Sequence, residues 1–278
     1  MIRLVTVVVP VHDEEDLLGA CLASLDLAGR HLRLTHPKVA LRVLAVLDRC
    51  TDASPRIARR EGVTRLFVDH GNVGATRSAG VRAGLDQATG AGVPPDRVWV
   101  ATTDGDSRVP LRWLTEMVDL ADAGMDLVVG TVEPDDMADP LVRARWHAEH
   151  HLTEGHPHVH GANLGFRGSA YLAVGGFRQQ AVHEDVELVE RLRERTDRWI
   201  ATDRTRVLTS GRAAGRARGG FADYLAGLAP ALTPATAGLV PSSRWTASTH
   251  QGTMSRGRRW WSAGSRPTRP GSPMPKCP

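Results

Sequence analysis

The chain has 278 residues, of which 41% are hydrophobic and 24% are charged. This length is enough for one sizeable α/β domain, alone or followed by a tail. No apolar run approaches the roughly 20 residues that span a bilayer. Residues 1–10 lack the small-residue cleavage site of a signal peptide, so we expect a cytoplasmic location. The three cysteines, Cys21, Cys50 and Cys277, are too widely spaced to indicate a disulfide framework or a zinc site.

The basic charge of the chain is concentrated at its C-terminal end. The formal net charge is +4, but residues 226–278 alone carry +7 and contain no Asp or Glu, so residues 1–225 carry −3. The mildly acidic body argues against a nucleic-acid-binding core. Pro, Ser, Thr, Gly and Arg dominate residues 226–278 without periodicity, which predicts a disordered tail. Its arginines and tryptophans are compatible with peripheral contact to an anionic membrane, although an unstructured extension fits the pattern better.

Strands and helices alternate along the first half of the chain. Residues 3–10 form an apolar, β-branched run that is typical of a strand buried on both faces. Asp13 follows, and we expect it to cap a helix whose first turn is acidic. Further strands are expected at 41–47, 65–69, 97–103 and 126–132, and helices at 54–61, at 74–88 and from Pro110 through Leu120. This alternation predicts an α/β fold with a mostly parallel central sheet flanked by helices.

Acidic residues follow three of the expected strands. Asp13 and Glu14 follow the first strand, Asp48 ends the second, and Asp104 and Asp106 follow the strand at 97–103. Ligands of open α/β sheets bind outside the carboxyl ends of the strands. We therefore expect these acidic groups to converge on one crevice.

The region from 133 to 225 is less regular. A polar, His-rich helix or loop is expected at 139–160, and an amphipathic helix begins near His183. The histidine spacings fit no standard zinc pattern, which favours a solvated loop over a metal site. His160 is the exception, because it directly precedes the glycine-containing segment 161–163.

Asp104 and Asp106 are the most informative pair. Two carboxylates that lie two residues apart at a strand end can bind one divalent cation together with a phosphate-bearing ligand. The alternative is a solvated Asp-Gly turn. Asp48 suits a base N–H or a ribose hydroxyl, or else it caps a turn. Arg77 lies near a helix start where it would meet phosphate, unless this is a plain loop-to-helix junction.

Glu184 and Asp185 open the amphipathic helix that begins near His183. An exposed acidic pair there would merely complement the helix dipole. A carboxylate held close to a reacting hydroxyl would instead serve as a general base.

Taken together and in order, six segments closely resemble the family-2 glycosyltransferases of the GT-A fold, a nucleotide-sugar-binding fold. They are residues 7–15, 44–52, 71–80, 102–110, 161–177 and 183–192. The resemblance extends over about residues 4–224. It implies a nucleotide-sugar-binding half at 1–132, an acceptor-binding half at 133–225, and a tail at 226–278.

The resemblance also implies roles for individual residues. Asp185 matches the catalytic base of inverting members, and Asp106 matches the ligand of Mn²⁺ or Mg²⁺. Residues that match positions binding the sugar donor are Pro10, His12, Glu14, Asp48, Arg77 and Asp104, and those assigned to the acceptor or transferred sugar are His160, Gly161, Asn163 and Glu184. A UDP-sugar is favoured, although Arg49 and Cys50 replace the Gly-Ser pair of the family motif and leave the base preference open. The Gln-x-x-Arg-Trp motif of processive synthases is absent, which favours transfer of a single sugar.

The expected function is therefore metal-dependent transfer of one sugar, with inversion, from a nucleotide-sugar to an unidentified hydroxyl acceptor. One alternative is a module that binds nucleotide-sugars without catalysis. A less favoured alternative is a sugar nucleotidyltransferase, because such enzymes usually carry a glycine-rich loop after the first strand. Here the first glycine is Gly19.

Overall fold

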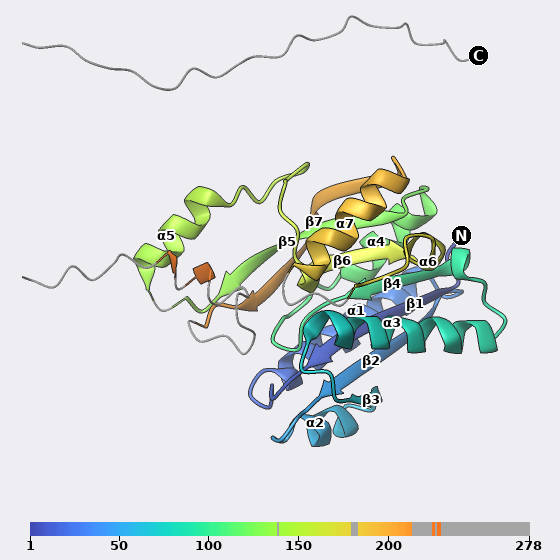
Figure 1. The fold of residues 1–278 in the computed structure, drawn as a ribbon, viewed down its shortest axis with the longest axis horizontal. Coiled ribbons are helices and arrows are strands. Elements are labelled where there is room, and N and C mark those ends of the chain that lie inside the picture. Colours follow the sequence, from blue (N-terminus) through green and yellow to red (C-terminus); the bar gives the residue numbers. More distant parts are fainter. Residues whose placement is uncertain (138, 179–182, 213–223, 226, 229–278) are drawn as a thin grey trace, which may run out of the picture. The chain divides into compact units, whose positions relative to one another are not determined.

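The structure is a computed structural model, shown in Figure 1, that describes residues 1–137, 139–178, 183–212, 224, 225, 227 and 228. The chain divides into two units, Met1–Leu232 and Thr233–Pro278, and every described residue belongs to the first. Apart from Gly227 and Leu228, the tail predicted at 226–278 lies outside the described residues.

A seven-stranded sheet with the order β3-β2-β1-β4-β6-β5-β7 forms the centre of the domain. Its strands are β1 (Leu4–Val11), β2 (Ala40–Asp48), β3 (Thr64–Val68), β4 (Val98–Thr102), β5 (Leu127–Asp135), β6 (Leu164–Arg167) and β7 (Trp199–Ser210). Strands β1 to β4 pair in parallel with one another, and β5 pairs in parallel with β7. β6 runs antiparallel between β4 and β5. The mostly parallel sheet and the five strands expected from the sequence, β1 to β5, are confirmed.

The sequence analysis did not predict β6 or β7, because neither strand has the apolar pattern by which the other strands were predicted. β6 has only four residues and contains Gly165, so it gives no apolar run. β7 lies at the edge of the sheet, and its buried positions are mostly threonines and small residues separated by Asp and Arg. Such a strand alternates in burial without alternating strongly in hydropathy.

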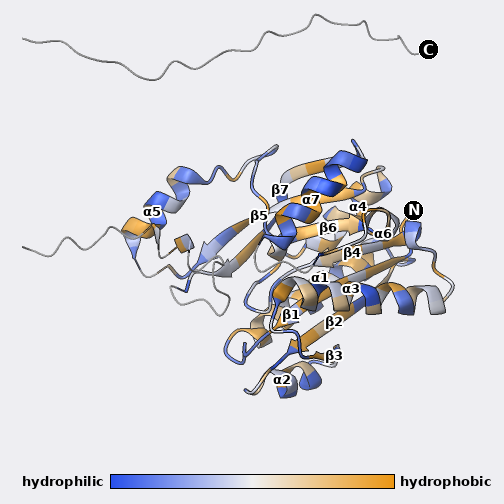
Figure 2. Ribbon diagram, in the orientation of Figure 1, coloured by the Kyte–Doolittle hydropathy of each residue, from blue (hydrophilic) through white to orange (hydrophobic). Residues whose placement is uncertain are grey.

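Helices cover both faces of the sheet, as Figures 1 and 2 show. The helices are α1 (Leu18–Thr35), α2 (Ser54–Arg60), α3 (Val73–Gly90), α4 (Trp113–Asp122), α5 (Pro140–Glu149), α6 (Gly168–Ala173) and α7 (Glu184–Arg195). One core cluster joins α1 and α4 to the sheet, and a second joins α3, α6 and α7 to its other face. In Figure 2 the central strands are mostly apolar, whereas the helices carry both polar and apolar residues. None of the helices in the described part of the chain is long and apolar enough to cross a membrane.

Two helix starts differ from the prediction. Asp13 does not cap α1: that helix begins at Leu18 and has no side-chain cap. The Asp13 carboxylate instead accepts hydrogen bonds from the backbone N–H groups of Thr51 (2.7 Å) and Asp52 (3.2 Å) in the loop after β2. Asp13 therefore joins the loop after β1 to the loop after β2 and does not cap a helix.

Pro110 does not open α4, which begins at Trp113. The Pro110 carbonyl accepts a hydrogen bond from the Trp113 N–H at 3.0 Å, so Pro110 belongs to the turn that leads into the helix.

Candidate active site

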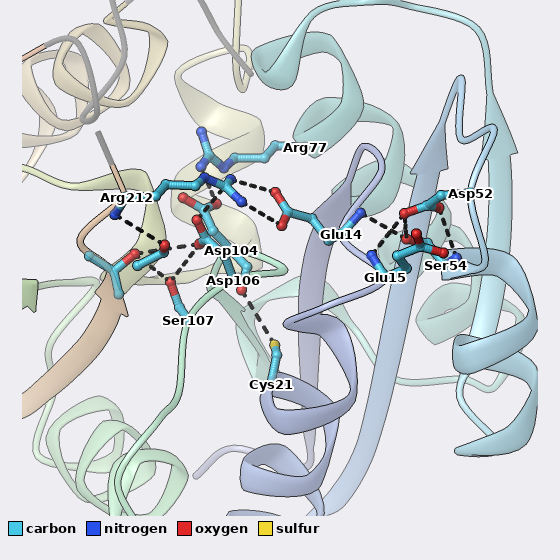
Figure 3. A network of polar contacts seen from close by, with 12 residues as sticks. Glu14, Glu15, Cys21, Asp52, Ser54, Arg77, Asp104, Asp106, Ser107 and Arg212 are labelled. Atoms are coloured by element: carbon cyan, nitrogen blue, oxygen red, sulfur yellow. Dashed lines mark hydrogen bonds and ion pairs between the residues drawn. The ribbon is translucent and has the colours of Figure 1, made fainter. Parts of the chain in front are cut away.

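Acidic side chains meet at the carboxyl ends of two adjacent parallel strands, whereas the sequence predicted convergence from three strand ends. The Asp48 carboxylate at the end of β2 instead binds the loop before α3, and Asp13 binds the loop after β2. Glu14 follows β1, and Asp104 and Asp106 follow β4 (Figure 3). The two loops are in close contact: a Cβ on Gly105 would lie only 3.3 Å from the carbonyl oxygen of Pro10, the buried proline near the end of β1. Glycine at 105 therefore lets the acidic loop after β4 lie directly against β1.

Arg77 connects this acidic loop to the start of α7. It lies on α3, is buried, and donates to Asp104 at 2.5 Å and to Glu184 through its other amino group. Burial alone would lower the pKa of Arg77, but the charges of Asp104 and Glu184 raise it above its ordinary value. Among the described residues its Nε has no hydrogen-bond partner. Arg77 is therefore a permanent cation that holds two carboxylates in fixed positions.

Asp106 lies deeper in the same cluster. Burial, followed by the charges of Asp104 and Glu14, raises the pKa of its carboxyl to about 6. Its Oδ1 accepts from Ser107 (3.3 Å) and Thr209 (3.4 Å). Its Oδ2 faces a cation that the sequence analysis did not identify.

That cation is Arg212, two residues beyond the end of β7. Its guanidinium makes a forked pair with Glu14, at 2.9 Å and 2.6 Å, and lies 3.1 Å from Asp106 Oδ2 (Figure 3). The side-chain hydrogen bond to Glu14 raises the pKa of Arg212, burial acts to lower it, and the charge of Asp106 raises it again. The net result is a pKa above the ordinary value for arginine. Sequence reasoning had no signal for Arg212, because the strand that positions it was itself not recognised.

Asp48 organises the loop before α3. Its carboxylate accepts from the backbone N–H groups of His70 (2.8 Å), Gly71 (3.0 Å) and Asn72 (3.3 Å), and from the Thr76 hydroxyl (2.8 Å). Burial acts to raise the pKa of Asp48, but these hydrogen bonds outweigh it and lower the pKa below the ordinary value. The turn-capping alternative thus describes what Asp48 does in this structure, and a contact with a nucleotide base stays a prediction.

His12 lies next to Asp48 at the start of the loop after β1. It is exposed, and its Nδ1 lies 2.8 Å from the Asp48 carbonyl oxygen. Its position is compatible with the predicted contact to the sugar donor.

Asp185 lies in the first turn of α7, directly after Glu184, which pairs with Arg77. Its Oδ2 accepts from the Gly161 N–H at 2.6 Å, while the Gly161 carbonyl accepts from Thr102 Oγ1 at 2.7 Å. Gly161 therefore ties the start of α7 to the end of β4. A Cβ at residue 161 would lie 2.6 Å from Arg77 Cζ, so only glycine leaves room for the buried guanidinium.

Asn163 is fully buried beneath this turn. Its Nδ2 donates to the carbonyls of Thr131 and Thr205, both at 2.7 Å, and its Oδ1 accepts from Trp113 Nε1 at 2.9 Å. Both N–H groups of the amide and its oxygen are thus hydrogen-bonded within the protein. In this structure Asn163 positions the turn, and a direct contact with the sugar stays a prediction.

His160 ends a row of aromatic rings that begins on α5. Trp146 stacks on His150 (centroids 4.4 Å apart), His150 on His158 (4.5 Å), and His158 lies 6.2 Å from His160. Burial and the neighbouring histidines lower the pKa of His160 to about 3, so this ring is neutral. The sequence favoured a solvated loop here, whereas His156 is buried and four of the histidine rings, those of His150, His156, His158 and His160, lie in stacked pairs.

The acidic cluster has the composition of a divalent cation site. It combines five carboxylates with two guanidinium groups, a formal balance of −3, and its members are Glu14, Asp104, Asp106, Glu184, Asp185, Arg77 and Arg212. Carboxylate oxygens are the ligands that Mg²⁺ and Mn²⁺ prefer. Asp106 Oδ2 has only Arg212 beside it among the contacts described above, so it can be offered to a metal if Arg212 moves.

A second group of potential ligands, formed by Asp13, Cys50 and Asp52, fits a hard cation less well. Their ligand atoms lie within 4.8 Å of one another. However, the two carboxylates already accept several backbone N–H bonds from residues 15, 51, 52 and 54. Burial raises the pKa of the Cys50 thiol, which keeps it protonated at neutral pH. We interpret this group as a loop-capping cluster.

Comparisons with known proteins identify the family and the fold of the chain. The chain matches the model of glycosyl transferase family 2 over residues 6–175. It is 30% identical over 124 residues to a dolichyl-phosphate hexose transferase of Haloferax volcanii, an alignment covering 45% of this chain and 46% of that protein. The chain thus spans about half the length of that curated relative.

Two solved structures share the fold. A mannosyltransferase from Pyrobaculum calidifontis, solved in complex with GDP-Man and Mn²⁺, has a TM-score of 0.52 and 20% identity, over 76% of this chain and 58% of that one. TarS from S. aureus, solved in complex with UDP, has a TM-score of 0.52 and 15% identity, over 75% of this chain and 61% of that one.

Proposed function

The chain belongs to glycosyl transferase family 2, and from this premise we propose that it transfers a single sugar from a nucleoside-diphosphate sugar to a hydroxyl acceptor, with inversion. One observation carries the proposal: Arg77 links two acidic segments, because it pairs with Asp104, whose loop also carries Asp106, and with Glu184, which directly precedes Asp185. A site with two such segments can hold a diphosphate through a cation at one and deprotonate a hydroxyl at the other.

On the side of the sugar donor, Asp106 and Asp104 would hold Mn²⁺ or Mg²⁺. When bound, the metal would neutralise the negative charge that develops on the leaving diphosphate. His12, Glu14 and Asp48 lie along the carboxyl ends of β1 and β2, where the nucleoside would bind. Two similar structures contain UDP or GDP-Man, which supports a nucleotide-sugar, and a UDP-sugar is the form we favour.

On the acceptor side, Asp185 would act as the general base. It removes the proton from the acceptor hydroxyl, whose oxygen forms a bond to the anomeric carbon. The bond from that carbon to the diphosphate oxygen breaks, and the leaving diphosphate takes the electron pair. Because attack comes from the face opposite the leaving group, the product has inverted configuration. The Gly161 N–H orients the Asp185 carboxylate for this step.

Calorimetric titration with UDP- and GDP-sugars, in Mn²⁺ and in EDTA, tests the binding half of the proposal. We expect one sugar nucleotide to bind in Mn²⁺, and we expect Asp106→Ala to lose that binding. Absence of binding by every sugar nucleotide, in a protein shown to be folded by circular dichroism, would contradict the proposal.

Replacing Asp185 by Asn tests the catalytic half, once the sugar nucleotide is known. Loss of a general base costs roughly 10²- to 10⁴-fold in rate, so we expect turnover to fall by that factor while the affinity for the sugar nucleotide changes little. Unchanged turnover would remove the assigned role from Asp185. Binding without any transfer by the wild type, across hydroxyl acceptors, would point to the non-catalytic alternative.

A further inference from the structure

Arg212 stands outside the segment that identifies the family, yet it contacts the centre of the site. The family match ends at residue 175, and Arg212 follows β7. Its guanidinium binds both oxygens of Glu14 and also reaches Asp106 Oδ2 (Figure 3). One side chain from late in the chain thus joins the loops that follow β1 and β4.

The two oxygens of Asp106 are not equivalent. Oδ1 lies within hydrogen-bonding distance of Ser107 and Thr209, whereas Oδ2 faces Arg212 at 3.1 Å. A metal held by Asp106 would therefore compete for Oδ2. Two cations on one carboxylate oxygen repel each other strongly where burial reduces screening by water. A guanidinium and a divalent cation are therefore alternative occupants of this position.

We propose that Arg212 is an internal counter-cation that a divalent metal must displace from Asp106. The inference rests on the proposed function, which assigns the metal to Asp106. It adds that the free protein binds metal weakly, because the metal must first separate Arg212 from its carboxylates. A nucleoside diphosphate favours the exchange, since its phosphates give the metal further oxygen ligands and give Arg212 a new anionic partner. Metal and nucleotide then bind cooperatively, with Arg212 as the source of the coupling.

Binding of Mn²⁺ to the full-length protein, followed by electron paramagnetic resonance of the free ion, measures this competition directly. After removal of metal with EDTA and dialysis, the wild type, Arg212→Gln and Asp106→Asn are titrated with and without UDP. We expect Arg212→Gln to bind Mn²⁺ roughly tenfold or more tightly than the wild type in the absence of UDP. We also expect UDP to enhance Mn²⁺ binding less in this variant than in the wild type.

Arg206→Gln is the matched control. Arg206 lies on the same strand and pairs with Asp203 and Glu133, away from the acidic loops. Its replacement removes the same charge from the protein but leaves Asp106 with its partner. Its Mn²⁺ affinity should stay within about twofold of the wild type.

Arg212→Lys covers the case in which Arg212→Gln does not fold. Lysine keeps the charge but lacks the planar fork that binds Glu14 and Asp106 together. We expect its Mn²⁺ affinity to lie between those of the wild type and Arg212→Gln, and an affinity no higher than that of the wild type overturns the proposal.

The remaining outcomes separate this inference from the proposed function. If Mn²⁺ binding depends on Asp106 but is the same in Arg212→Gln and the wild type, Arg212 is only a structural tie and displacement is wrong. If neither protein binds Mn²⁺ through Asp106, even with UDP, the proposed metal site is wrong and the displacement falls with it.

Discussion

Gly161 shows how a single hydrogen atom in place of a side chain can set the geometry of the site. A Cβ there would lie 2.6 Å from both Cζ and Nη1 of Arg77. The guanidinium cannot withdraw easily, because Asp104 and Glu184 hold it from two directions. We therefore expect Gly161→Ala to lower the free energy of unfolding by about 1–3 kcal/mol, the usual cost of overpacking a rigid site, as measured by urea denaturation.

Gly19→Ala provides the control for this change. Gly19 lies inside α1 and has nothing within 4 Å of the position that its Cβ would occupy. Alanine there should leave stability unchanged or raise it by up to about 1 kcal/mol, because alanine is the better helix former. Equal changes in the free energy of unfolding at both positions would mean that alanine at 161 does not clash with Arg77.

The raised pKa of Asp106 should be visible in the pH dependence of stability. Its pKa is about 6 in the folded protein, above the value of 3.8 expected for an ordinary aspartate. Between these values the folded state binds more protons than the unfolded state, so the contribution of Asp106 to stability falls as pH rises. From pH 4.5 to pH 7.5 we expect the wild type to lose about 2 kcal/mol relative to Asp106→Asn.

Denaturation of both proteins in EDTA at pH 4.5 and at pH 7.5 checks this prediction. Only the change with pH is interpreted, since the substitution also alters the contact with Arg212 at every pH. A stability difference that stays constant across this range would show that the Asp106 pKa is not raised.

Residues at strand ends could be predicted from the sequence, and residues that depend on unrecognised elements could not. Asp104 and Asp106 follow a strongly apolar strand, so their position followed from topology. Arg212 depends on β7, whose polar sequence gave no strand signal. Asn163 was identified in the right segment, but its burial depends on Trp113 and on strands that pair only in three dimensions.

At the scale of elements, the turn at 161–163 is held by one amide. Asn163 binds a carbonyl of β5, a carbonyl of β7 and the indole N–H of Trp113 on α4. Leucine in its place would leave those three buried groups without partners, at a cost of about 1–3 kcal/mol for each group that water cannot reach. We expect Asn163→Leu to lose on the order of 3 kcal/mol or more of stability, as measured by chemical denaturation.

Gln87→Leu makes a comparable replacement on the exposed side of α3. No buried group depends on that side chain, so its effect should lie within about 0.5 kcal/mol. A similarly small effect of Asn163→Leu would mean that the turn does not rely on the amide.

At the scale of the whole molecule, charge and site are separated along the sequence. All residues named in the site lie between Pro10 and Arg212, within the unit Met1–Leu232. Residues 226–278 carry +7, and the rest of the chain carries −3. Acceptors and membranes that attract this chain electrostatically would therefore do so through the C-terminal unit, while the chemistry belongs to the N-terminal unit.

Deleting Thr233–Pro278 tests that division. The shortened chain should keep its unfolding midpoint and its binding of sugar nucleotide, because the site belongs to the unit Met1–Leu232, which the deletion leaves whole. It should also lose sedimentation with anionic phosphatidylserine vesicles, since each basic residue near such a surface contributes about 1 kcal/mol and the deletion removes all seven.

Replacing the six arginines of the tail by glutamine should reproduce the loss of sedimentation, and neutral phosphatidylcholine vesicles should bind none of the proteins. If the shortened chain sediments with anionic vesicles as well as the full chain does, membrane attraction resides in the N-terminal unit, where the exposed arginines of α5 and β7 would be the next to replace.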